Sequence, residues 1–316
     1  MTEEPKNGTR RVLNGKECIY FDGYWIRFYP IPDDTLATRK LLIDHLSKRT
    51  FHHTEGGINT PGERLEDARQ AYQTEQDPMR KRVNAAMLAG ALFNRATDIF
   101  TAVVELESKG IKINRDNELM KQCADCFKEA LELGRNVKHY SGEEGIDELW
   151  GEPFKAFTQP ITQIFESRYR KIALTMRDID NIEQNIVRVF EDDRLFQPVL
   201  APFARLVESA KLQLETMKSD IVFFKVWPQF VANREVVEEF LPESSGYGYK
   251  QQPRVAEGLK LINTGTELIT YLSEVRVPMP RSTKLFLAKC EAYKRERQKS
   301  TYSPEQLSAS ATSGSS

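Results

Sequence analysis

The feature that most constrains this chain is a long apolar segment from Val83 to Leu106, VNAAMLAGALFNRATDIFTAVVEL. At 3.6 residues per turn, its apolar side chains point in nearly every direction rather than along one stripe. This pattern indicates a helix that is buried over most of its circumference. We therefore predict that the other helices pack around this segment.

Helix start and stop signals bracket the apolar segment. Asp77 is a good N-cap residue, and Pro78 suits the first helical position because its missing N–H would have no partner there. Lys109-Gly110 is a typical helix end, since glycine readily adopts the left-handed conformation that closes a helix. The apolar segment is thus predicted to form one helix between these two signals.

A second long helix is predicted from Ile161 to about Asp192. Four apolar residues recur at seven-residue spacing: Phe165, Ile172, Ile179 and Ile186. At 1.5 Å per residue, this stripe would follow a rod roughly 45 Å long. Charged residues such as Arg168 and Lys171 lie on the opposite face. The stripe is typical either of a helix in an intramolecular bundle or of a coiled-coil dimer seam.

The N-terminal region has the pattern of a small antiparallel sheet. Asn14-Gly15 and Asp22-Gly23 are strong signals for two-residue hairpins, because a type I′ turn requires positive φ at both central residues. The flanking segments are rich in β-branched and aromatic residues, which favour strands. Three strands alone are marginally stable in water, so we expect this β-meander to pack on the helices.

Together these patterns predict a mainly α fold: a multi-helix bundle of about eight helices, some long, with a small N-terminal three-stranded antiparallel β-meander. The acidic, glycine-containing stretch SGEEGIDELWGEPF is the best candidate for a boundary between two helical lobes. The predicted organisation is a disordered tail at 1–9, the β-meander at 10–31, an N-terminal helical lobe at 32–140, a connector at 141–160, a C-terminal helical lobe at 161–302 and a disordered Ser-rich tail at 303–316.

Composition excludes several classes of protein. The 45 basic and 46 acidic residues give a net charge of −1, which argues against attraction of the whole molecule to nucleic acid or to an anionic membrane. Four cysteines in 316 residues do not make a disulfide scaffold. No signal-peptide core follows the polar N-terminus, and the longest uncharged run in the apolar helix, Val83 to Asn94, is too short to span a bilayer. We expect a soluble cytoplasmic protein with no transmembrane segment.

Catalytic signatures of the common enzyme classes do not occur in the sequence. There is no GxGxxG, no P-loop lysine motif, no GxSxG elbow and no kinase signature. Cys123 and Cys126 form a CxxC, but they lie well inside a helical pattern with no preceding strand and no second CxxC. These two thiols are therefore interpreted as core residues. No metal site is assigned, and the cofactor is unknown.

One loop nevertheless combines residue types that suit catalysis. His52, His53 and Glu55 lie in a glycine-rich stretch, where imidazole and carboxylate groups are able to act as an acid–base pair or as metal ligands. The polar face of the apolar helix adds Arg95 as an anion anchor and Asp98 as a further carboxylate. An enzyme with its site between this loop and that helix is the alternative to a purely structural role.

The last predicted helix, at 281–299, is locally basic. Its positive charges outnumber Glu291 and Glu296 by seven to two. The seven cations are Arg281, Lys284, Lys289, Lys294, Arg295, Arg297 and Lys299. Such a patch could contact the phosphate backbone of nucleic acid or an anionic lipid surface. It is also typical of a solvated helix face whose charges suit a helix C-terminus.

The leading functional hypothesis is non-enzymatic. Long amphipathic helices, abundant aromatic residues and near-neutral charge favour a helical interaction or assembly protein that binds a protein partner or associates with itself. The enzyme hypothesis and the phosphate- or lipid-binding hypothesis remain the two alternatives.

Overall fold

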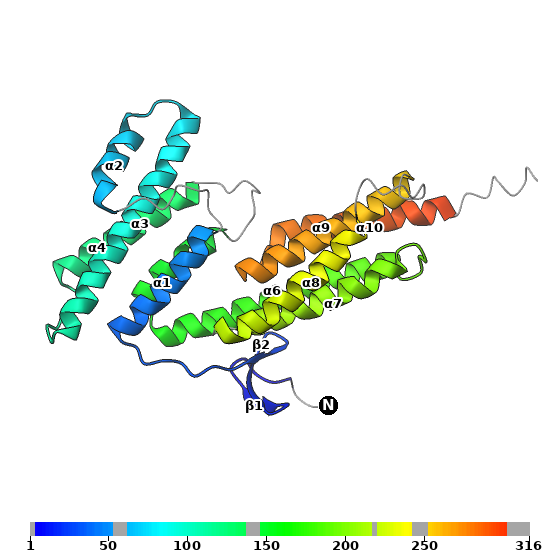
Figure 1. The fold of residues 1–316 in the computed structure, drawn as a ribbon, viewed down its shortest axis with the longest axis horizontal. Coiled ribbons are helices and arrows are strands. Elements are labelled where there is room, and N and C mark those ends of the chain that lie inside the picture. Colours follow the sequence, from blue (N-terminus) through cyan, green and yellow to red (C-terminus); the bar gives the residue numbers. More distant parts are fainter. Residues whose placement is uncertain (1–3, 53–61, 137–145, 217–219, 242–251, 302–316) are drawn as a thin grey trace, which may run out of the picture. The chain divides into compact units, whose positions relative to one another are not determined.

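The structure is a computed structural model that describes residues 4–52, 62–136, 146–216, 220–241 and 252–301. It confirms the predicted fold class, with ten α-helices and a three-stranded antiparallel sheet in these residues (Figure 1). The chain forms two compact units. Unit 1 comprises Met1–Leu174 and Val275–Met279, and unit 2 comprises Thr175–Glu274 and Pro280–Ser316. The division between Leu174 and Thr175 falls within the helix that begins at Ile161.

The N-terminal sheet has the predicted hairpin turns. Its strands are β1 (Arg10–Leu13), β2 (Lys16–Phe21) and β3 (Tyr24–Arg27), which pair in sequence order. Asn14 and Asp22 have positive φ values of 51° and 46°, and the glycines that follow them are also in this region, as type I′ turns require. The loop residues therefore set the register of the sheet.

The sheet packs on α6 (Ile161–Phe190) through aromatic residues. The ring of Phe21 stacks on Tyr169 with the centroids 5.7 Å apart, and the backbone N–H of Tyr29 donates to the Tyr169 hydroxyl at 3.1 Å. Ile26 of β3 is fully buried. The predicted packing of the meander on the helices is therefore observed within unit 1.

The core of unit 1 is organised around the apolar helix. The other elements are α1 (Leu36–His52), the 3-10 helix η1 (Gly62–Arg64), α2 (Leu65–Thr74), α3 (Pro78–Ser108), α4 (Glu118–Asn136) and α5 (Ile146–Thr158). The Asp77 side chain accepts a hydrogen bond from the N–H of Arg80, and Gly110 has a φ of +85° beyond the C-cap, so both predicted end signals are confirmed. Length and composition would also allow α3 to cross a membrane, but 56% of its most apolar stretch is buried, as a core helix requires.

Helix α5 lies in the segment predicted to be a connector. Pro153 in its interior has no N–H to donate to the carbonyl of Leu149, four residues earlier. The hydroxyl of Thr50 on α1 donates to the carbonyl of Leu149 at 3.2 Å and also to the carbonyl of Leu46 on its own helix at 2.9 Å. The carbonyl that proline leaves without a partner is therefore satisfied by α1. Gly134 of α4 permits a close approach on another side of α5, since a Cβ there would lie 2.6 Å from the Trp150 ring.

Unit 2 is a bundle formed by the second half of α6 with four further helices (Figure 1). These helices are α7 (Gln197–Glu215), α8 (Asp220–Glu239), α9 (Pro253–Val275) and α10 (Pro280–Thr301). The Phe190 ring lies 4.4 Å from Phe196 and 5.5 Å from Tyr293, centroid to centroid. The heptad-spaced residues of α6 are all buried within the chain, so this stripe is a bundle face and not a free dimer seam.

Candidate functional site

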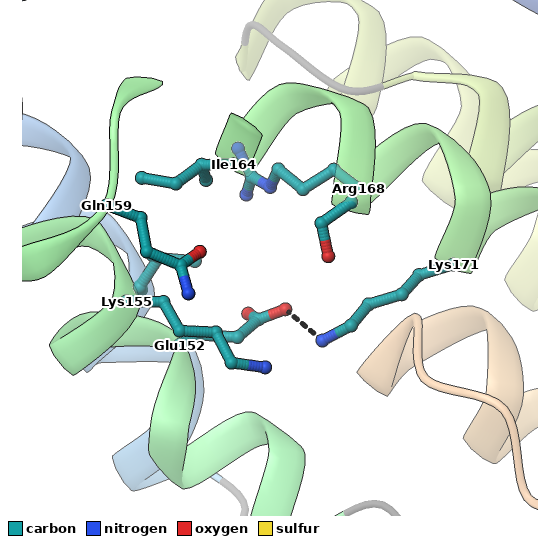
Figure 2. A pocket seen from close by; sticks show the side chains of 8 residues that line it. Glu152, Lys155, Gln159, Ile164, Arg168 and Lys171 are labelled. Carbon is teal, nitrogen blue, oxygen red and sulfur yellow. Dashed lines mark hydrogen bonds and ion pairs between the residues drawn. The ribbon is translucent and has the colours of Figure 1, made fainter. Parts of the chain in front are cut away.

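Unit 1 contains a group of charged side chains that is largely shielded from solvent. At its centre lies Glu152 of α5, which is only 7% exposed. Nη2 of Arg49 on α1 lies 3.1 Å from Glu152 Oε2, and Nζ of Lys171 on α6 lies 3.2 Å from Glu152 Oε1 (Figure 2). Arg49 also donates to the carbonyl of Val275 at 2.9 Å. Side chains from three helices therefore meet at one carboxylate, and we call this group the Glu152 cluster. Arg49 links it to the distant segment at Val275.

The Glu152 cluster has an excess of positive charge. Its cations are Arg49, Lys155, Arg168, Lys171 and Arg276, which are coupled electrostatically to Glu152 or to one another. The only other carboxylate among the described residues of the cluster is Glu148, which lies 3.3 Å from Lys171 and whose side chain is 52% exposed. The cations therefore outnumber the carboxylates among the described residues of the cluster.

A small cavity adjoins the Glu152 cluster, and Figure 2 shows six of the side chains that line it. It is lined by Leu46, Glu152, Lys155, Gln159, Ile164, Ser167, Arg168 and Lys171. The space available to the centre of a water-sized molecule is ≈ 20 Å³. A single water needs roughly 10–15 Å³ by this measure, so the cavity has room for one small polar species.

Several polar groups around the cavity have no protein partner. Among the described residues, neither Nζ of Lys155 nor the guanidinium of Arg168 makes a hydrogen bond or an ion pair, and Oε2 of Glu152 has no aligned hydrogen-bond donor. Burial lowers the pKa of both Lys155 and Arg168. Both side chains are half-buried, whereas the buried atoms of the cluster that lack a hydrogen-bond partner are Oε2 of Glu152 and Nε of Arg49.

The pKa of Glu152 reflects these neighbours. Burial alone would raise the pKa of its carboxyl group, but the charges of Arg49 and Lys171 outweigh burial and lower this pKa from the ordinary 4.5 to about 2. Arg276 has a pKa lowered to about 10 by burial and by the nearby Arg49 and Arg168. The carboxylate of Glu152 is therefore ionised, and holds the cations together, throughout the physiological pH range.

This pKa predicts a contribution of Glu152 to acid sensitivity. A carboxyl group whose pKa is lower in the folded state than in the unfolded state stabilises the fold. For Glu152 this stabilisation is complete at pH values above 4.5, the ordinary pKa, and it is lost as the pH falls towards 2, the pKa in the folded state. We compare how much the free energy of unfolding of unit 1 falls when the pH is lowered from about 6 to about 3. This fall is expected to be about 2 kcal/mol larger in the native chain than in a Glu152→Gln variant. Urea unfolding, followed by hydrogen exchange of α5 amides at both pH values, measures this difference. Equal losses in the two proteins would contradict the assignment.

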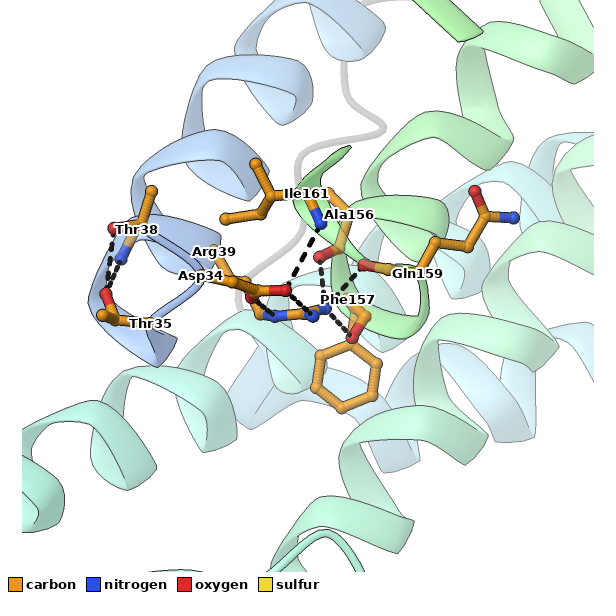
Figure 3. A network of polar contacts seen from close by, with 8 residues as sticks. All are labelled: Asp34, Thr35, Thr38, Arg39, Ala156, Phe157, Gln159 and Ile161. Atoms are coloured by element: carbon orange, nitrogen blue, oxygen red, sulfur yellow. Dashed lines mark hydrogen bonds and ion pairs between the residues drawn. The ribbon is translucent and has the colours of Figure 1, made fainter. Parts of the chain in front are cut away.

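A second network fixes the junction between α5 and α6 (Figure 3). Arg39 is a buried residue, with only 4% of its surface exposed. Its Nη1 donates to three carbonyls at the end of α5: Ala156 at 3.4 Å, Phe157 at 3.1 Å and Gln159 at 2.8 Å. These carbonyls lie at the negative end of the helix dipole, which favours a cation there. Arg39 therefore caps α5.

The same arginine is held in place by an acidic partner. Nε and Nη2 of Arg39 donate to the two carboxylate oxygens of Asp34 at 2.7 and 2.9 Å, and Asp34 Oδ2 accepts from the N–H of Ile161 at 3.4 Å. The hydrogen bonds from Arg39 lower the pKa of Asp34. One ion pair thus joins the end of α5 to the start of α6, the two helices that carry most of the side chains around the cavity.

The residues proposed for an enzyme site are only partly described. His52 ends α1, but its side chain, together with His53 and Glu55, lies outside the described residues. Arg95 and Asp98 are exposed on α3, and Gly62 packs against them so closely that a Cβ there would lie 2.7 Å from Asp98 Oδ2. The end of the loop therefore lies on the predicted face of α3, while a meeting of the histidines with Asp98 stays a prediction.

The basic residues of 281–299 lie along α10 and differ in exposure. Exposed positions are Arg281, Lys284, Lys289, Arg295 and Lys299, whereas Lys294 and Arg297 are half-buried. Arg297 donates to the carbonyl of Val189, and Glu291 pairs with Arg188. Part of this set therefore contributes to packing in unit 2, and binding of nucleic acid or lipid by the rest stays a prediction.

The cysteines have the character of core residues. Cys123 and Cys290 are fully buried, and desolvation raises the pKa of each to about 12, so both are protonated thiols at neutral pH. Within the part of the chain that the structure describes, no group of three or more His, Cys, Asp or Glu side chains is placed to hold a metal ion. Neither a reactive thiolate nor a metal centre is thus visible in these residues.

Sequence reasoning did not identify the Glu152 cluster. A signal was present, because Glu148, Glu152 and Lys155 are spaced i, i+4 and i+7 and so share one face of α5. On α6, Arg168 and Lys171 were assigned to the polar face without a partner. Their convergence depends on the packing of α1, α5 and α6 and therefore became visible only in the folded structure.

Comparison with known proteins gives no relative for this chain. No protein-family model matches it, and no curated protein or solved structure matches it either. The geometry of the described residues is therefore what bears on function.

Proposed function

We propose that this protein is a non-enzymatic interaction or assembly protein that binds a protein partner through α8. The observation that carries this proposal is an apolar stripe, which we call the α8 stripe, made of Phe224, Trp227, Pro228 and Val231. Its members are spaced i, i+3, i+4 and i+7 and therefore lie on one face of the helix. Phe224 is 70% exposed, Pro228 is also exposed, and the other two are half-buried.

The α8 stripe is distinct from the face that α8 uses for packing. Val226, Phe230 and Val237 form the buried face of α8. Nδ2 of Asn233 donates to the Ser209 hydroxyl of α7 at 2.6 Å, which fixes the orientation of α8 in the bundle. Because one apolar face already stabilises unit 2, a second one that reaches solvent is a surface suited to binding.

Charge next to the stripe indicates the chemistry of the partner. One and two turns beyond Val231, the same face carries the exposed acidic residues Glu235, Glu238 and Glu239. A partner that complements this face has an apolar groove with lysine or arginine side chains at one end. This is the arrangement in which an amphipathic helix binds a groove through i, i+3, i+4 and i+7 anchors. We therefore assign a groove-bearing protein with a basic rim as the occupant.

The test compares Phe224→Ser with Leu285→Ser, a matched loss of an exposed apolar residue, 58% exposed, on α10. Affinity purification with quantitative mass spectrometry identifies proteins retained by the native chain and by Leu285→Ser but lost with Phe224→Ser. Binding of the purified partner is then measured directly. We expect Phe224→Ser to raise the Kd about tenfold or more and Leu285→Ser to leave it unchanged.

Two results would overturn this proposal. One is a purified partner whose Kd is the same with Phe224→Ser as with the native chain. The other is a dimer of the native chain, measured by light scattering, that dissociates in Phe224→Ser, because the occupant of the α8 stripe would then be a second copy of the chain.

A further inference from the structure

The outer edge of β1 presents backbone groups that the sheet does not use. The strand order is β1-β2-β3, so β1 pairs with β2 on one side only. In an antiparallel pair, successive residues direct their N–H and C=O groups alternately towards and away from the partner strand. The N–H of Tyr20 on β2 donates to the carbonyl of Thr9 at 2.9 Å, which sets this alternation. Arg10 and Val12 therefore direct their backbone groups away from β2.

This edge is open in the part of the chain that the structure describes. Among these residues, the outward N–H and C=O groups of β1 have no backbone partner. The residues before β1 contact β2 and its turn instead. Glu4 accepts a hydrogen bond from the Tyr20 hydroxyl at 2.6 Å, and Asn7 donates to Asp22 at 2.7 Å. Val12 is 67% exposed, so a further strand has access to the edge.

The edge carries positive charge. Lys6, Arg11 and Lys16 are exposed, and none of these side chains makes an ion pair with a described residue, whereas Arg10 pairs with Glu17 at 3.8 Å. If the edges of two copies paired antiparallel through their outward groups, Arg11 would lie opposite Arg11 of the second copy. Like charges directly opposite one another are destabilising. The charge therefore disfavours self-pairing and favours an acidic strand.

We propose that the edge of β1 binds an extended acidic segment of a partner protein, which adds to the sheet as a fourth strand. Its backbone exchanges hydrogen bonds with Arg10 and Val12. Because side chains alternate between the two faces of a sheet, acidic residues at every second position lie on the face of Arg11. The β-branched residues between them lie on the face of Val12. The edge belongs to unit 1, so this proposal is independent of partner binding by α8.

The test measures binding of labelled peptides to the full chain by fluorescence anisotropy. The probe is a peptide of alternating glutamate and valine, EVEVEV. KVKVKV reverses the charge. A third peptide has the side chains of EVEVEV but a methyl group on every backbone amide, so it retains the charge and cannot donate backbone hydrogen bonds. We expect both control peptides to bind at least about tenfold more weakly than EVEVEV.

Two variants at Val12 test the edge itself. Val12→Pro removes an N–H that points away from β2, so β1 is expected to keep its pairing with β2. This variant is expected to weaken binding of EVEVEV at least about tenfold, whereas Val12→Thr, which keeps the N–H, is expected to change it less than about twofold. Hydrogen exchange of the β2 amides verifies that the sheet is intact. Phe224→Ser is expected to bind EVEVEV as the native chain does.

Each arm of this experiment has a decisive outcome. The proposal is wrong if EVEVEV does not bind at about 1 mM, if its methylated form binds equally well, or if Val12→Pro with an intact sheet binds it normally. A dimer of the native chain, measured by light scattering, that dissociates in Val12→Pro would assign the edge to a second copy instead. If Val12→Pro loses protection of β2, the comparison of the three peptides on the native chain still decides the question.

Discussion

Replacing Glu152 with glutamine is expected to lower the free energy of unfolding of unit 1 by about 3–5 kcal/mol, the usual cost of removing one partner from a buried ion pair. The variant retains Arg49, Lys155, Arg168 and Lys171 around a neutral amide, so the cations repel one another with little access to solvent. Hydrogen exchange of the α5 amides in a urea series reports on this unit.

Glu148→Gln is a matched control for that prediction. Glu148 also pairs with Lys171, at 3.3 Å, but its side chain is 52% exposed, whereas that of Glu152 is 8% exposed. Exposed ion pairs usually contribute only about 0–1 kcal/mol, so this variant is expected to remain close to the native chain. Similar losses in the two variants would show that burial is not what makes Glu152 important.

Replacing Arg39 with methionine is expected to cost about 2–4 kcal/mol, because it removes the donor to the last carbonyls of α5 and leaves these groups poorly solvated. It also removes the partner of Asp34, which links α5 to the start of α6. The predicted signature is a local one. Hydrogen exchange is expected to accelerate first in peptides that contain the end of α5 and the start of α6.

The adjacent Lys40→Met variant is the control for Arg39. Lys40 pairs with Asp44 one turn further along α1, and such i, i+4 pairs contribute about 0.2–0.5 kcal/mol. It removes a positive charge from the same helix without touching the junction. An Arg39→Met variant as stable as Lys40→Met would contradict the capping role assigned to Arg39.

Much of the fold could be predicted because its signals are local. The turns at Asn14-Gly15 and Asp22-Gly23 and the N-cap at Asp77 depend only on neighbouring residues, and all were predicted correctly. Helix α5 was missed for a physical reason. Gly151 and Pro153 are poor helix formers, and the carbonyl of Leu149 that Pro153 leaves without a donor is satisfied by Thr50, about a hundred residues earlier in the chain.

The Glu152 cluster could not be predicted from such local signals. A glutamate in an acidic, glycine-containing stretch usually indicates a solvated segment, and only contacts with α1 and α6 reduce the exposure of Glu152 to 7%. The α8 stripe was also overlooked, because a helix with apolar residues on two faces has no clear amphipathic pattern. Which of its faces reaches solvent depends on the packing of α7 and α8.

The division of the chain has a consequence for how the two units fold. Val275–Met279 belongs to unit 1, whereas Thr175–Glu274 before it and Pro280–Ser316 after it belong to unit 2. The 100 residues of Thr175–Glu274 therefore form an insertion between two parts of unit 1, and they fold together with Pro280–Ser316. While the insertion is unfolded, bringing Val275 to Arg49 closes a flexible loop, which costs about 4 kcal/mol of chain entropy by the (3/2)RT ln n relation. A folded insertion no longer behaves as a flexible chain. Mutations that unfold unit 2 are therefore expected to weaken unit 1 through chain connectivity alone.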